Sequence, residues 1–246
     1  MPLYKEQGIV LRSMKLGEAD KIVTVMTQGS GKVRAVAKGI RKTTSRFGAR
    51  LEPFTHVSVM NYRGRGSLDT ITQAEIIAPH PNLRSSLSLF AAGETMLESV
   101  DKVAEEHERN VRLMLLLLWG LRALDAVPRD PSAVAESFVL KLLSLSGFHP
   151  ALTGCASCGA ADPRLFDAAQ GGGVCPRCAG PGAGPVSPQA LQLLSELAIT
   201  DLALVGTTAP ADGIVRRESR SLLYGFAEFH MERRLKSLPM LARTAP

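Results

Sequence analysis

A change of sequence pattern at Pro79-His80-Pro81 divides the chain into two parts that favour different secondary structure. Before it, five short runs rich in β-branched residues are separated by turn signals such as Gly29-Ser30-Gly31, which is typical of a hairpin. The runs cover residues 8–11, 22–26, 33–37, 57–60 and 70–76. Five strands within about 75 residues favour a small closed or partly open β-barrel.

After this point, apolar residues recur at helical spacing. We expect one helix to begin near Asn82, a candidate N-cap, and a second, apolar on nearly all sides, to cover 111–126. A third is predicted over 133–146, with Gly147 at the C′ position where helices commonly end. Ser187-Pro188 predicts the start of another helix, with serine as the cap and proline in the first turn.

A last helix is expected from about Asp212 to Ser237. Leu222, Phe226 and Phe229 recur at helical spacing and predict an apolar stripe that packs into the helical domain. Three cations follow, and we expect them in the final turn, where positive charge meets the negative end of the helix dipole. They are Arg233, Arg234 and Lys236. The alternative is that they also contact nucleic acid and extend its path from the barrel across the domain junction.

The sequence therefore predicts an α+β multidomain chain, with a barrel over 1–79 and an α-helical domain over 80–246. Its 246 residues suit two domains of ordinary size. The longest strongly apolar run, 113–121, is far shorter than the roughly 20 residues that a membrane span needs. The N-terminal residues contain no continuous apolar signal core. We expect a cytoplasmic protein.

Positive charge is concentrated in the first third of the chain. Residues 1–80 hold 13 Lys and Arg against 6 Asp and Glu, whereas residues 81–246 hold 16 against 17. The stretch 21–51 contains eight cations and no acid. Such a surface is typical of proteins that bind phosphate groups, in nucleic acid or on an anionic membrane. The alternative is a merely solvated face.

All four cysteines lie in one region, as two pairs that each enclose two residues and are separated by 16 residues. They are Cys155, Cys158, Cys175 and Cys178. This spacing is typical of a four-cysteine zinc site, in which each pair covers one side of a tetrahedral ion. The alternatives are two disulfides, which a cytosolic location disfavours, or four unrelated thiols. We predict one structural Zn²⁺ per chain in a module at about 152–181, because four protein ligands leave no position open for water.

No motif indicates catalysis. The only His-x-Glu, His230-Met231-Glu232, follows the cysteines rather than preceding them as in zinc deaminases. Gly29-Ser30-Gly31-Lys32 lacks the spacing of a phosphate-binding loop. The sequence gives no positive sign of an enzyme.

Several basic and glycine-containing stretches of the first part resemble RecO, the bacterial recombination-mediator family of the RecF repair pathway. These stretches are 17–23, 27–32, 37–42, 45–48 and 51–54. Residues 136–149 with the two cysteine pairs resemble the helical domain of that family, and 230–238 resemble its terminal helix.

The resemblance implies an N-terminal OB-fold followed by a helical domain that carries the zinc module. It also implies a non-catalytic, nucleoid-associated protein that binds single- and double-stranded DNA and anneals complementary strands. Its expected partners are RecR and the single-strand-binding protein (SSB), with which it helps to load recombinase onto SSB-coated DNA. No small-molecule substrate and no membrane are expected.

An OB-fold binds single strands through a cationic groove and aromatic stacking. We therefore predict that cations on the third strand and the following loop contact phosphates. They are Lys32, Arg34, Lys38, Arg41, Lys42, Arg46 and Arg50. Phe47 is the candidate stacking residue, or else a loop anchor packed on the barrel. Two other functions stay open: an RNA-binding or ribosome-associated zinc protein without annealing activity, and an adaptor that binds only proteins.

Overall fold

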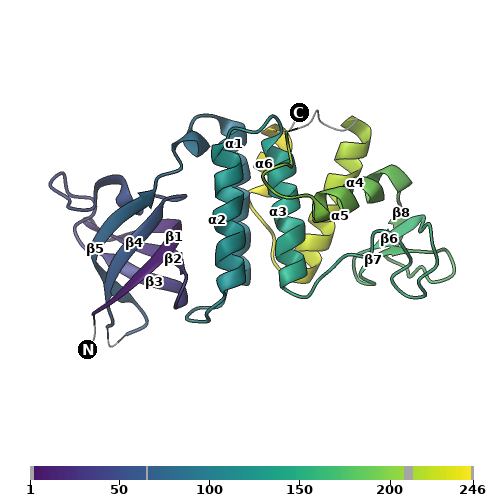
Figure 1. Cartoon of the computed structure of the whole chain (residues 1–246). Helices are drawn as coiled ribbons and strands as arrows, with labels where there is room; N and C mark the ends of the chain where they lie inside the picture. Colours follow the sequence, from purple (N-terminus) through teal and green to yellow (C-terminus); the bar gives the residue numbers. More distant parts are fainter. Residues whose placement is uncertain (1–2, 65, 208–212, 245–246) are drawn as a thin grey trace.

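The computed structural model describes residues 3–64, 66–207 and 213–244. Figure 1 shows a β-barrel at the N-terminal end, a group of helices in the middle and a small three-stranded sheet at the opposite end. The pattern change at residues 79–81 therefore marks the passage from strands to helices, as predicted.

The five predicted strands are all present and form one closed barrel in the order β1-β2-β3-β5-β4. Their bounds are β1 Leu3–Leu16, β2 Asp20–Thr27, β3 Gly31–Ala37, β4 His56–Tyr62 and β5 Asp69–Ala78. Neighbouring strands are antiparallel except β3 and β5, which pair in parallel at only two positions. Of the two forms that the sequence predicts, closed and partly open, the barrel has the closed one, and it is OB-like.

Alternate residues of β1 connect the barrel to the helices. Val10 points into the barrel core, which also contains Val23 and Val59, whereas Ile9 and Leu11 belong to the core of the helical domain. Successive side chains of a strand point to opposite faces, so one strand contributes to both cores. The helical domain consequently covers one side of the barrel.

Six α-helices are described. Their bounds are α1 Leu87–Val103, α2 Val111–Asp125, α3 Pro131–Leu145, α4 Pro188–Ile199, α5 Gly213–Met231 and α6 Leu238–Thr244. Two short 3-10 helices, η1 Gly48–Leu51 and η2 Pro81–Arg84, lie before them. The predicted N-cap at Asn82 is wrong: Ser86 caps α1 through Leu89 N–H, and the Asn82 amide instead donates to the Asp125 carbonyl at 2.8 Å.

Two other helix boundaries are confirmed. Gly147 follows the end of α3 with a φ of 90°, the left-handed region that favours glycine. The Ser187 hydroxyl accepts from Ala190 N–H at the start of α4. Of the residues that the structure describes, none belongs to a helix long and apolar enough to cross a membrane.

The expected terminal helix differs from α5. Its expected first residue, Asp212, lies outside the described residues, and α5 ends at Met231. The three cations after it are therefore in a loop and not in a final helical turn. The predicted stripe is also wrong in part, because Phe226 is buried whereas Phe229 is 52% exposed. The buried face contains Arg216 and Arg220 instead, which no apolar pattern signals.

Candidate nucleic-acid interface and metal centre

A loop between β3 and β4 projects from the end of the barrel away from the helices (Figure 1). We call residues 38–50 the basic loop. Its backbone is held in place: Gly39 N–H donates to the Asp20 carboxylate at 2.7 Å, and Arg41 N–H donates to the Ala19 carbonyl at 3.0 Å. Ile40 and Leu51 are buried in the barrel and fix the two ends of the loop.

Five of the predicted phosphate contacts are exposed on this loop. They are Lys38, Arg41, Lys42, Arg46 and Arg50. None of the five takes part in an ion pair among the described residues. Arg41 and Arg50 donate hydrogen bonds, but only to backbone carbonyls. Because the loop orders these cations without neutralising them, it forms a positive surface that faces solvent.

The structure corrects the role of Phe47 as a stacking platform. Phe47 is 1% exposed and packs in the barrel core with Ile40 and Leu51. The Arg46 guanidinium lies 5.1 Å from the centre of its ring. The ring therefore offers no face to a base, and the alternative that the sequence left open, a loop anchor, describes it.

Lys32 and Arg34 are half-buried and contact acids of the helical part. Lys32 Nζ donates to the Asp101 carbonyl at 2.6 Å and lies 3.6 Å from the Asp101 carboxylate. Arg34 forms an ion pair with Glu106 at 3.4 Å. The segment after α1 also pairs with β3, where His107 N–H donates to the Lys32 carbonyl. These two cations join the domains, so their predicted role as phosphate contacts is not supported.

The sequence pattern does not identify Lys15 as part of the positive surface. It is exposed on β1, directly opposite Lys21 of β2. Glu18 and Asp20 lie between these lysines in the sequence, so this stretch does not stand out as a run of basic residues. The antiparallel register of two strands joined by a short turn is the signal that places them together.

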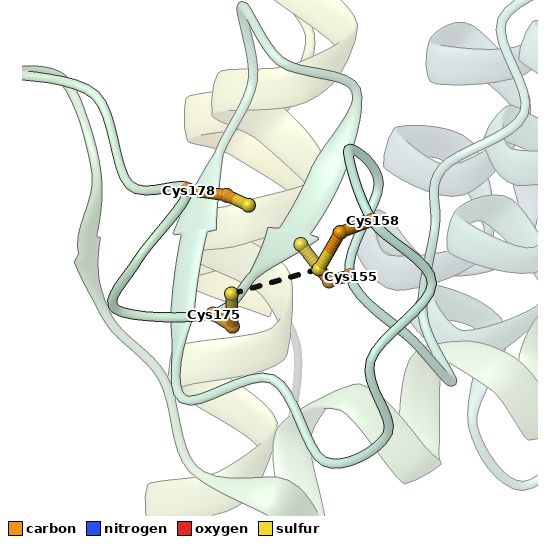
Figure 2. Close-up of side chains that lie close together, drawn as sticks. All are labelled: Cys155, Cys158, Cys175 and Cys178. Carbon is orange, nitrogen blue, oxygen red and sulfur yellow. Dashed lines mark hydrogen bonds between the residues drawn. The ribbon is translucent and has the colours of Figure 1, made fainter.

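The four cysteines converge in one cluster, as predicted. Figure 2 shows Cys155 and Cys158, from the loop after α3, facing Cys175 and Cys178, which follow β7. The four sulfur atoms lie within 4.8 Å of one another, and those of Cys158 and Cys175 are 3.8 Å apart. A tetrahedron with zinc–sulfur bonds of about 2.3 Å has sulfur–sulfur edges of about 3.8 Å, so the donor set fits this ion.

Local structure preorganises this cluster. A small sheet, made of β6 Leu165–Asp167, β7 Gly172–Val174 and β8 Gly184–Pro185, supports the second cysteine pair. Gly159 closes the first pair with a φ of 73°, and its N–H donates to the Cys155 carbonyl at 2.9 Å.

The electrostatics of the cluster call for a cation. Backbone N–H groups of Cys175 and Cys158 lower the pKa of Cys155 to about 6, which favours a thiolate. Hydrogen bonds from Cys178 to the sulfurs of Cys175 and Cys158 raise the pKa of Cys178 to about 12. Four thiols this close cannot all ionise unless a metal ion compensates their charge.

Comparison with known proteins gives consistent matches. The family described as "Recombination protein O N terminal" matches residues 1–80, and "Recombination protein O C terminal" matches residues 84–239. The chain is 44% identical to the DNA repair protein RecO of Frankia casuarinae, over 99% of this chain and all of that protein. It is also 44% identical to RecO of a Nocardioides species and 42% identical to RecO of Streptomyces coelicolor, each over at least 97% of both chains.

Proposed function

Because the chain belongs to the RecO family of DNA repair proteins, we propose that its basic loop binds DNA and that the protein anneals complementary strands. The observation that carries this proposal is the set of five exposed cations without acidic partners at the outer end of the barrel. Phosphate groups are the ligands that such a surface attracts most strongly.

Binding through this loop would depend little on sequence. The basic loop contributes cations, which contact the phosphates that all sequences share. The barrel side formed by Ile9, Leu11 and Met26 packs against helices and is closed to bases. Annealing follows from the same property, because a protein that neutralises phosphates reduces the repulsion between two strands that approach each other.

We infer that the cysteine cluster holds one structural Zn²⁺ per chain. The geometry of four sulfur donors fits that ion, and four protein ligands leave no site for a reacting water. Bound zinc would compensate the thiolate charge and hold the loop after α3 against the small sheet. No step of DNA binding is assigned to the metal.

In this proposal, residues 1–79 form the nucleic-acid-binding part and residues 80–246 the helical part, with RecR and SSB as protein partners. Together they would load recombinase onto SSB-coated single strands, without catalysis by this chain, at the bacterial nucleoid. Family membership supports this assignment.

The test compares three proteins in one strand-annealing assay: wild type, Arg41→Glu/Lys42→Glu/Arg46→Glu, and a control with the same change of charge. The control is Arg112→Glu/Arg129→Glu/Arg217→Glu, whose arginines are exposed on the helical part. We expect the loop variant to lose annealing and binding to both single- and double-stranded DNA, and the control to keep them.

Equal behaviour of the two variants would contradict the assignment of the loop. Tight RNA binding by the wild type without annealing of DNA would instead support an RNA-binding protein. Binding of RecR and SSB is measured in the same series, and absence of both interactions would refute the proposed loading role.

A further inference from the structure

The loop that connects α5 to α6 has a fixed shape. Glu232 has a φ of 51°, which turns the chain directly after the helix. Glu98 of α1 then accepts hydrogen bonds from Lys236 N–H at 3.0 Å and from Ser237 N–H at 2.8 Å. Leu235 is 2% exposed and packs inward. We call residues 232–237 the C-terminal loop.

This shape directs three cations outward. The side chains of Arg233, Arg234 and Lys236 are exposed, and no ion pair among the described residues involves them. The loop therefore repeats the main property of the basic loop, an ordered backbone that presents unneutralised positive charge.

A groove of about 660 Å³ separates the C-terminal loop from the barrel. Arg12 and Lys32 line it from the barrel, and Lys102 lines it from α1. Two of the three acidic residues that line the groove already have partners. Asp101 forms an ion pair with Arg12 at 2.8 Å, and Glu98 holds the backbone of the C-terminal loop. Burial and the nearby charge of Glu98 raise the pKa of Glu94.

Strand β1 connects this groove to the basic loop. Arg12 lies at the groove, Lys15 is exposed farther along the strand, and the Gly17 carbonyl just after the strand accepts from Arg41 at 3.0 Å. At about 3.3 Å per residue, the five steps from Arg12 to Gly17 span roughly 16 Å. Lys15 beside the basic loop and Lys102 at the groove are the cations of this route that have no ion pair among the described residues, whereas Arg12 is paired with Asp101.

We propose that a nucleic-acid strand held by the basic loop continues along β1, across the groove, and ends on the C-terminal loop. This inference rests on the proposed function and extends its binding surface beyond the barrel. The occupant is a single-stranded phosphate backbone, because a groove of about 660 Å³ has room for a single strand and not for the much wider duplex. The C-terminal loop then contributes phosphate contacts that only a strand long enough to cross the junction can reach.

The experiment measures binding of oligonucleotides of about 8 and about 20 nucleotides, lengths on either side of common OB-fold site sizes. Salt dependence is recorded for wild type, Arg234→Gln/Lys236→Gln, and the control Arg129→Gln/Arg217→Gln. With the longer strand, loss of two phosphate contacts makes the slope of log K against log salt shallower by about 1.4. The variant should also gain less affinity than wild type when the strand is lengthened. Melting temperatures verify that each variant is folded.

Lys102→Gln on α1 serves as a second variant, and a slope shallower by about 0.7 is expected for one lost contact. The proposal is overturned if Arg234→Gln/Lys236→Gln matches wild type on the longer strand, or if the control changes as much. If the wild type itself shows no salt-dependent binding, the proposed function fails before this extension is reached.

Discussion

Arginines in two regions of the molecule experience opposite environments. Between α3 and α5, Arg216 and Arg220 are at most 8% exposed, and Glu136, which lies between them, is 1% exposed. Arg216 lies 2.9 Å from Glu136 and 3.3 Å from Asp130, while Arg220 lies 2.8 Å from Glu136. In the basic loop, by contrast, Arg41 and Arg46 are exposed and have no acidic partner among the described residues.

The difference separates two uses of charge. A buried ion must be paired, because removal from water costs several kcal/mol. An exposed cation keeps its hydration without a partner and is available to a phosphate. We therefore assign the arginines of α5 to stability and those of the basic loop to binding. The predictions that follow test this division.

Removal of metal should have the largest effect on stability. Like the buried arginines, the thiolates of the cysteine cluster need a partner of opposite charge, and for them this partner is a metal cation. Structural zinc sites contribute on the order of 10 kcal/mol to the fold that surrounds them. We expect about one zinc per chain by elemental analysis, and a large drop in melting temperature for Cys155→Ser. A metal-free protein with unchanged melting would contradict a structural site.

Arg216→Met should destabilise the protein by about 3–5 kcal/mol, because Asp130 then lacks its buried counter-charge and Glu136 keeps only Arg220. Denaturant unfolding measures the loss. DNA affinity of the folded fraction should not change. The exposed Arg217→Met on the same helix is the control and should leave stability nearly unchanged. A loss of DNA affinity at constant folded fraction would break the division between the two arginine sets.

Phe47→Leu should lower stability by about 2 kcal/mol, since three buried carbon atoms are lost from the barrel core. DNA affinity of the folded protein should be unchanged. If Phe47 instead stacked on a base, affinity would fall roughly tenfold or more, because such stacking contributes about 1–3 kcal/mol. Binding titration of the folded variant decides between these outcomes.

The smallest effect distinguishes two lysines at opposite ends of β3, Lys32 and Lys38. Lys38→Gln should make the salt slope of single-strand binding shallower by about 0.7, because one phosphate contact is lost. Lys32→Gln removes the contact with Asp101 and should cost up to about 1 kcal/mol of stability with no change of slope. An equal change of slope in both variants would mean that Lys32 also reaches DNA.

Local patterns predicted most of the fold. β-Branched runs and turn residues gave all five strands, and cap residues gave the start of α4 and the end of α3. The cysteine spacing gave the cluster without any knowledge of the chain path. The start of α1 was misplaced because Asn82 uses its side chain on Asp125, a partner 43 residues away.

What failed depended on tertiary packing. The sequence shows how many cations lie between residues 21 and 51, but not which of them an acid from the helical domain neutralises. Lys32 and Arg34 were grouped with the basic loop because Asp101 and Glu106 are distant in sequence. Phe47 was ambiguous for the same reason, since only the folded barrel determines whether its ring is covered.

The central claim is that exposed cations of the basic loop bind phosphates, and its most direct test is the salt dependence of wild-type binding to single strands of about 8 nucleotides and unrelated sequence, which are too short to reach the C-terminal loop. With about five phosphates contacted by these residues, log K should fall against log salt with a slope near −3.5, and the slope should be the same for each sequence. A slope near zero, or affinity that depends strongly on sequence, would contradict the account.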